Sequence, residues 1–243
     1  RNGYQSLTVE DTTAVSGYST LDVNLNGFYF IAGRVFAGEN PIETGFAYGY
    51  KMLEGNVVDI FADMVGEAGW YEFSGLSSAQ YITKAEPAPG SVYYGDYLPT
   101  YYGDVIHWEE ATLIDLSQGT DDAAIHLVAV TNAPQGPGSI SGSIDYGVKT
   151  EGVPVILRTS GGSVMMTTSA ADGTFSFPGI AYGTYQVFAE VAGKSVYPHT
   201  VILDEAIPAV SDIKMVILEN SIVFLGIANS EIFKTELLVY PNP

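Results

Sequence analysis

The sequence has no cysteine among its 243 residues and is poor in basic side chains. The absence of cysteine excludes disulfides, thiolate metal sites and cysteine nucleophiles, and it leaves the redox state of the compartment open. Only 9 Lys and Arg residues stand against 28 Asp and Glu, which gives a formal net charge of -19 at pH 7. Nucleic-acid binding requires a basic surface that displaces counterions from phosphates, so we expect no nucleic-acid partner.

Long apolar runs are missing as well. The best candidate, residues 213–225, falls short of the ~18 residues that a membrane helix needs. It is also interrupted by Lys214, Glu219 and Asn220. We therefore expect no insertion into a membrane. The chain begins at Arg1 without a basic and apolar leader, which indicates either a removed signal or a piece of a longer protein.

The composition and the spacing of apolar residues indicate a folded β protein. The chain is 47% hydrophobic and 15% charged, which is too apolar for a disordered chain. Apolar residues recur with period two, as at Val153, Val155 and Leu157. Turn pairs such as Asp172-Gly173 interrupt these runs about every 8–12 residues, which favours an antiparallel sandwich or barrel. Residues 53–68 also fit a helical stripe, so a helix stays open there.

An internal repeat decides between these possibilities. Residues 69–76 (GWYEFSGL) align with residues 173–180 (GTFSFPGI) at an offset of 104, and the same offset pairs Tyr81 with Tyr185. Upstream, IAGRV at residues 31–35 matches ISGSI at residues 140–144. Two copies of one sandwich is the economical interpretation. The second copy has only a short β-branched segment in place of residues 53–68, which favours a strand in both copies.

The repeat also suggests where the modules begin and end. Residues 21–25, 124–128 and 212–216 look like one alternating closing strand. We therefore predict a first β-sandwich over residues 27–133 and a second over residues 138–218, joined by a Pro- and Gly-rich linker. Residues 1–26 are predicted to be the closing hairpin of a preceding module or an extra strand, and residues 219–243 a linker.

The second copy carries the pattern of a known family. It runs from Gly142 between isoleucines, through GVPV at residues 152–155 and DGTFSF at residues 172–177, to GTYQV at residues 183–187. This pattern resembles the carboxypeptidase-regulatory-like modules, and the first copy resembles them more loosely. The resemblance implies a seven-stranded, prealbumin-like and Ig-like sandwich. It also implies a structural or accessory role in secreted bacterial proteins, because these modules have no catalytic residues of their own.

The C-terminal residues carry a second resemblance. Residues 239–243 (VYPNP), with Tyr240, Pro241, Asn242 and Pro243, look like the start of the sorting domain that directs cargo through type IX secretion. The alternative is a Pro-rich turn at the end of a domain. The resemblance implies a protein that is extracellular or on the outer surface of a Gram-negative bacterium, and secretion machinery as a partner.

The residue types of catalytic sites are present but not assembled. His107, His126 and His199 fall in three separate strands or loops, and neither a Gly-x-Ser-x-Gly elbow nor a His-Glu-x-x-His helix occurs. On a strand, the neighbours Glu109 and Glu110 would face opposite ways and could not flank one bond. We expect no enzyme activity.

Metal binding has a weak basis. Asp121-Asp122 and Glu10-Asp11 lie in predicted turns, where carboxylates and carbonyls could bind Ca²⁺. The spaced acidic residues of a calcium loop are missing, so we predict no cofactor and keep Ca²⁺ as an alternative. The acidic residues concentrate in the first module, with 15 against 3 basic over residues 27–133, which fits a solvated surface or a divalent-cation surface.

A Tyr-rich segment at residues 91–108 has no counterpart in the second module. Rings with polar edges beside carboxylates are suited to stacking on sugars, which would make a carbohydrate-binding platform. Alternatively, the rings cover the open end of the sandwich as a lid with Trp108 in the core, and the family resemblance favours this. The candidate ligand-binding residues are Tyr94, Asp96, Tyr97, Tyr101, Tyr102 and Asp104.

The sequence thus predicts a non-catalytic spacer or adhesion-type segment of a secreted cell-surface protein. Its partners would be other domains of the same polypeptide. The alternatives are a carbohydrate-binding accessory region of a larger secreted enzyme, with glycans as partners, and a segment that secretion machinery recognises.

Overall fold

The computed structural model describes residues 29–117, 119–120, 122–132, 134–147, 150–162 and 164–225. Predictions that concern residues 1–26, Asp121 or residues 239–243 lie outside this part of the chain. The chain divides into two compact units, Arg1–Thr131 and Asn132–Pro243. Within the described residues no helix is long and apolar enough to cross a membrane.

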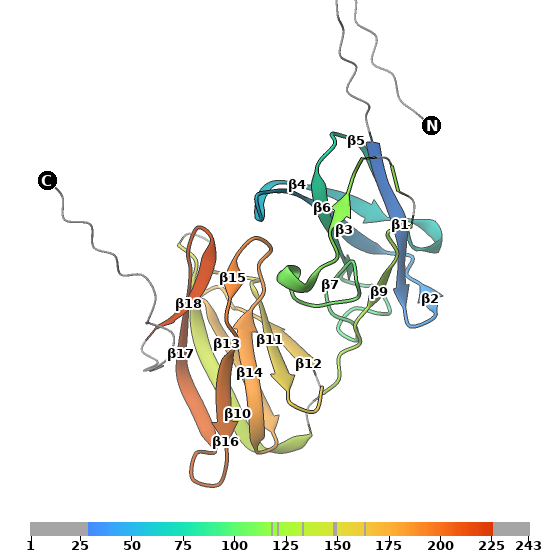
Figure 1. The fold of residues 1–243 in the computed structure, drawn as a ribbon. Coiled ribbons are helices and arrows are strands. Elements are labelled where there is room, and N and C mark those ends of the chain that lie inside the picture. The colour runs from blue at the N-terminus through green and yellow to red at the C-terminus, as the bar shows by residue number, and fades with distance from the viewer. Residues whose placement is uncertain are drawn as a thin grey trace, which may run out of the picture. The chain divides into compact units, whose positions relative to one another are not determined.

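The first unit consists of two β-sheets (Figure 1). In one sheet β1 lies between β5 and β9, and β2 also pairs with β1. The other sheet has the order β4-β3-β6-β7, and β8 also pairs with β6. Two short 3-10 helices, η1 (Glu67–Gly69) and η2 (Trp108–Glu110), connect strands. The strands are β1 (Tyr29–Ala37), β2 (Asn40–Pro41), β3 (Gly45–Leu53), β4 (Asn56–Val65), β5 (Trp70–Leu76), β6 (Gln80–Pro87), β7 (Thr100–Tyr101), β8 (Ile114–Asp115) and β9 (Ile125–Leu127).

The second unit also consists of two β-sheets. One has the order β13-β10-β17-β18-β15, and the other has the order β12-β11-β14-β16. Its strands are β10 (Gln135–Asp145), β11 (Pro154–Thr159), β12 (Val164–Thr168), β13 (Thr174–Ile180), β14 (Gly183–Ala189), β15 (Ser195–Val196), β16 (His199–Leu203), β17 (Ala209–Ile217) and β18 (Ser221–Leu225). The sandwich extends beyond residue 218, where the sequence analysis ended it, because β18 pairs with both β17 and β15.

The two units follow the same path. The core of one sheet is β5-β1-β9 in the first unit and β13-β10-β17 in the second, and the facing sheets are β4-β3-β6 and β12-β11-β14. The predicted fold class, all-β with two tandem prealbumin-like sandwiches, is therefore confirmed. One detail differs from the antiparallel expectation: the closing strand runs parallel to the opening strand, β9 to β1 and β17 to β10.

A glycine lies at the same crossing point in both units. Gly33 pairs with Tyr71, and Gly142 pairs with Phe175. A Cβ atom on Gly33 would overlap the carbonyl oxygen of Ala123, and one on Gly142 would overlap that of Ile213. The opening and closing strands can approach this closely only because the side chain is absent.

These contacts correct the alignment of the closing strands. The sequence comparison matched Ile125 with Ile213, whereas the structure places Ala123 at the position of Ile213. The difference is two residues. Because successive side chains of a strand alternate between its faces, a shift of two keeps the apolar residues on the same face, and the sequence pattern alone could not detect it.

A buried tyrosine hydroxyl closes the turn before β6 and before β14. Tyr81 donates to the carbonyl of Ser77 at 2.9 Å, and Tyr185 donates to the carbonyl of Ala181 at 2.7 Å. The offset of 104 therefore relates whole hydrogen-bonded turns as well as residue types.

Residues 56–65 form strand β4, so the strand prediction for this region is confirmed and the helical alternative is wrong.

The cores are made of the inward residues of both sheets in each unit. Core residues of the first unit include Ile31, Val35, Tyr71, Phe73, Tyr81, Leu116 and Ile125, and those of the second include Ile140, Val155, Leu157, Phe175, Phe177, Val187 and Met215.

Candidate ligand-binding surfaces

The Tyr-rich segment is fastened to the first sandwich through its backbone. The Leu98 amide donates to the Val128 carbonyl at 2.8 Å, and the Tyr102 amide donates to the Thr83 carbonyl at 2.9 Å. The Thr100 hydroxyl accepts from the Val128 amide at 2.9 Å. These bonds join the segment to β6 and to the residues after β9, which is the arrangement expected of a lid.

The rings of this segment do not share one exposed surface. Tyr101 is 1% exposed, whereas Tyr94 is 60% exposed. Tyr97 packs edge-to-face against Tyr93, with ring centroids 5.8 Å apart, and both pack against the core. Tyr102 also packs against the core. Among the four predicted stacking residues, only Tyr94 presents most of its ring to solvent.

The two carboxylates of the predicted platform have different surroundings. Asp104 is in the left-handed backbone region, with a φ of 60°. Its carboxylate accepts from the His126 amide at 2.7 Å and lies 3.2 Å from His126 Nδ1. The His126 ring in turn stacks on Phe36 at 5.1 Å. Asp104 therefore ties the segment to β9, while the exposed Asp96 lies near Tyr94, outside this contact.

A polar cluster on the outer face of β3 and β6 escaped the sequence analysis. The Tyr48 hydroxyl donates to Glu86 at 2.9 Å, and the Lys84 ammonium lies 4.6 Å from the centre of the Tyr48 ring. Burial and the neighbouring Glu86 carboxylate raise the pKa of Tyr48. In the sequence, this cluster could have been recognised from Lys84 and Glu86, which alternate along one predicted strand. The three side chains satisfy one another, and they form a structural cluster.

The histidines and the paired glutamates lie in different elements of the fold. His107 Nε2 lies 3.0 Å from Glu109, and His199 lies in β16, where burial lowers its pKa. Glu109 and Glu110 belong to η2, so the expectation of a strand at these residues is wrong. The described part of the chain contains no group of three or more His, Asp or Glu side chains that could hold a metal ion.

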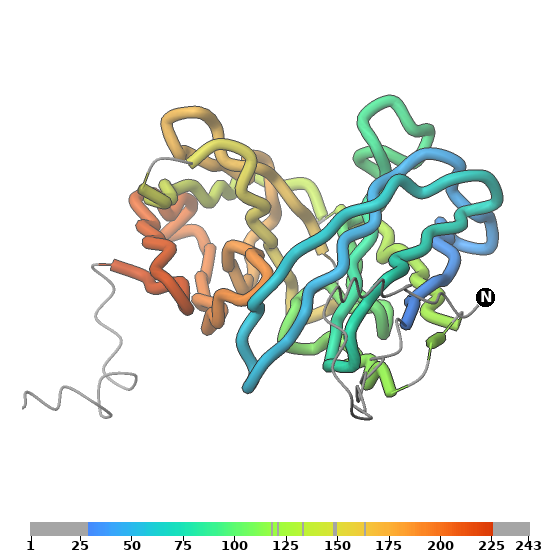
Figure 2. Tube along the Cα trace, turned by 90° about the horizontal axis from the view of Figure 1, so that it is seen from above, coloured from blue at the N-terminus to red at the C-terminus, as the bar shows by residue number. Residues whose placement is uncertain are grey.

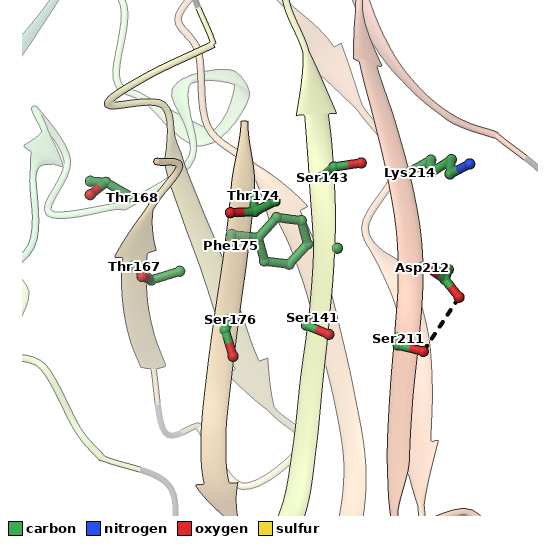
Figure 3. A pocket seen from close by; sticks show the side chains of 11 residues that line it. Ser141, Ser143, Thr167, Thr168, Thr174, Phe175, Ser176, Ser211, Asp212 and Lys214 are labelled. Carbon is green, nitrogen blue, oxygen red and sulfur yellow. Dashed lines mark hydrogen bonds between the residues drawn. The ribbon is translucent and has the colours of Figure 1, made fainter. Parts of the chain in front are cut away.

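The second unit has a groove that the sequence analysis did not predict (Figure 3). Its volume is about 690 Å³, and it lies over the outer face of β10, β13 and β17 beside β12. Strand β17 bulges here, because its register with β10 shifts between Ile140 and Gly142, and Asp212 takes a φ of 67°. Most of the lining side chains carry a hydroxyl group: Ser141, Ser143, Thr167, Thr168, Thr174, Ser176 and Ser211, with Asp212, Lys214 and buried Phe175 as the others.

The groove offers hydrogen bonds without an apolar platform. Ser211 donates to Asp212 at 3.4 Å, and Phe175 lies inside the sandwich. The visible sequence signal was the alternation of serine along β10. A polar surface of this kind can bind water and polar groups, but it lacks the exposed ring that sugar stacking uses.

Comparison with known proteins adds little to this picture. No family model and no curated protein matches the sequence. Among solved structures, the chain is similar to a streptococcal ancillary pilin, with 16% identity, 76% of this chain and 61% of that chain covered, and a TM-score of 0.28. It thus spans less than two thirds of that pilin. It is also similar to the minor pilin of Streptococcus agalactiae (11% identity, 80% and 96% covered, TM-score 0.28) and to the major pilin subunit of Bacillus cereus (9% identity, 78% and 99% covered, TM-score 0.30).

Likenesses this remote carry no argument about function. The fold assignment rests on the strand order and pairing of the two units themselves.

Proposed function

We propose that this chain is a non-catalytic structural or adhesion-type segment of a secreted, cell-surface protein. In this role the two sandwiches space or present other domains of the same polypeptide. The observation that carries the proposal is that side chains with reactive or ionisable groups make hydrogen bonds that hold the fold together. Tyr81 and Tyr185 close equivalent turns, and Asp104 binds His126 to fasten the Tyr-rich segment.

The duplication supports the same role. What the two units share is the set of contacts that closes the sandwich, such as the glycines at the strand crossings. Their outer faces differ, since the first carries the Tyr48–Glu86 cluster and the second carries the hydroxylated groove. A duplicated scaffold with diverged surfaces is expected of spacer and presentation modules, whose function depends on length and stability.

The sequence resemblances refine the proposal. We assign both units to the carboxypeptidase-regulatory-like modules and residues 239–243 to the start of a type IX sorting signal, which would locate the protein on a Gram-negative cell surface. Deleting residues 226–243 from the full precursor leaves β18 intact, so the sandwiches should still fold. Loss of export in that variant is the expected result, and unchanged export would refute the sorting assignment.

The main proposal is tested by locating the protein on intact source cells. An antibody against the two units should label cells that have not been permeabilised, and external protease should remove the signal. Labelling only after permeabilisation would exclude a cell-surface role. Turnover of a substrate by the purified chain would exclude a purely structural one.

A further inference from the structure

Strand β4 is an unusually long and apolar edge. It spans ten residues at the outside of its sheet, and it is the outer strand of the long β3–β4 hairpin in Figure 2. Ile60 and Met64 are 59% and 72% exposed and lie on one face of the strand, and Val58, which is 52% exposed, lies at a bulge where the register with β3 shifts. An exposed edge of this kind is a template for pairing with another strand.

Two amides on the open side of β4 are bonded to carboxylates. The Ile60 amide donates to Asp59 at 2.9 Å, and the Met64 amide donates to Asp63 at 2.8 Å. Asp63 also accepts from the Glu72 amide of β5 at 3.2 Å, so it covers the edges of both sheets. Because backbone groups alternate along a strand beyond the bulge at Val58, the amides and carbonyls of Ile60, Ala62 and Met64 face outward.

The second unit does not need this arrangement. Its equivalent edge strand, β12, has only five residues, and short edge strands are poor templates. The first unit has an edge twice as long and has an aspartate beside two of its outward amides. Charged side chains on the inner face of an edge strand are a known means of preventing edge-to-edge pairing.

The sequence of β4 also fits a second copy of itself. In an antiparallel pair with its two-fold axis at Phe61, Ile60 lies opposite Ala62 of the second copy, within the regular part of the strand from Asp59 to Val65. The apolar rows of the two strands then extend each other. Asp59 lies opposite Asp63 of the second copy in the same register, and directly opposed like charges are destabilising.

We propose that β4 is a pairing surface for a second copy of this chain, and that Asp59 and Asp63 keep it unpaired. The carboxylates act in two ways, since they occupy outward amides and they repel the same residues of an approaching copy. Removing both should therefore convert a monomer into a symmetric dimer joined through β4.

The test compares the full chain with the double variant Asp59→Ala/Asp63→Ala in sedimentation equilibrium. The wild type should have the monomer mass of 25.9 kDa, and the double variant should have twice that mass. The matched control Glu39→Ala/Glu43→Ala removes the same charge from exposed residues that do not belong to β4 and should stay monomeric. Dimerisation of this control would show that net charge alone is responsible and would refute the proposal.

A third substitution locates the interface. Ile60→Lys in the double variant places a charge in the apolar row and should restore the monomer, whereas Ile202→Lys on exposed β16 should leave the dimer intact. A double variant with native circular dichroism that remains monomeric would overturn the proposal, as would a dimer that Ile60→Lys does not dissociate.

If the alanine variant fails to fold, Asp59→Asn/Asp63→Asn keeps the side-chain acceptors while removing the charge. It should dimerise detectably, and a folded, strictly monomeric asparagine variant would refute the repulsion between copies.

Discussion

At the scale of single residues, several side chains with ionisable groups serve to hold the backbone in place. Tyr71 is fully buried, donates to the Ala123 carbonyl at 2.6 Å, and has its pKa raised by burial to about 12. It contacts the same strand crossing that Gly33 keeps open. A residue type alone therefore says little about chemistry here, because its surroundings decide whether it is available.

The two crossing glycines should not tolerate a methyl group. We expect Gly33→Ala or Gly142→Ala to destabilise its own unit by roughly 1–3 kcal/mol, because the Cβ overlaps a backbone carbonyl that cannot move without breaking the sheet. Gly66→Ala and Gly161→Ala are matched controls, since an added Cβ there meets nothing closer than 3.8 Å. Denaturant unfolding measures the difference, and equal effects at test and control positions would contradict the close approach.

The lid and platform interpretations of the Tyr-rich segment differ in what alanine substitution does. We expect Tyr97→Ala to lower the free energy of unfolding by about 2 kcal/mol, because its ring packs on Tyr93 and the core. Tyr94→Ala should change it by less than about 0.5 kcal/mol. Carbohydrate binding through Tyr94 and Asp96 stays a prediction, and a glycan array with wild type and Tyr94→Ala tests it. Binding that Tyr94→Ala abolishes, without a change in stability, would favour the platform.

At the scale of elements, period-two patterning predicted the long strands well. It failed where short local contacts decide the backbone conformation. Residues 56–65 form the expected strand although they also fit a helical stripe, because β3 offers a ladder along their whole length. Glu109 and Glu110 form a 3-10 turn after His107, which two residues of sequence cannot reveal. The closing strands were found, but their register was set by the glycine contacts.

Strand β16 gives the second unit a dependence on pH. Burial lowers the pKa of His199 from 6.5, so between the lowered value and 6.5 the unfolded chain binds a proton that the folded chain does not. Stability should therefore rise with pH through this window and fall on acidification. His199→Gln should weaken this dependence, as measured by thermal unfolding on both sides of pH 6.5. An unchanged dependence of stability on pH in His199→Gln would contradict the assignment to His199.

Asp172 acts in a lower pH range. Hydrogen bonds from Thr174 lower the pKa of Asp172, so its contribution to stability is lost only below pH 3.8.

At the scale of the whole molecule, the two units share their design and have separate cores. Each unit closes its own pair of sheets, with its own glycine crossing and its own tyrosine-closed turn. The first unit is also the more acidic, which suits a surface that stays solvated.

Separate cores predict separate responses to mutation. Gly142→Ala should reduce the hydrogen-exchange protection of amides in β10, β13 and β17 while leaving β1, β5 and β9 unchanged, and Gly33→Ala should do the reverse. Hydrogen exchange followed by mass spectrometry measures both sets in one sample. Loss of protection in both units from either substitution would mean that they unfold as one cooperative body.

The sequence by itself determined the fold class, because alternation, turn residues and an internal repeat act locally and are written in the order of the residues. It also indicated which turns the two copies share, through Tyr81 and Tyr185. Only the tertiary structure decided the parallel closing strands, the separation of the Tyr-rich rings, the groove beside β17 and the aspartates that cover the β4 edge. These features depend on which strands meet, and contacts between distant parts of a chain leave no periodic trace in its sequence.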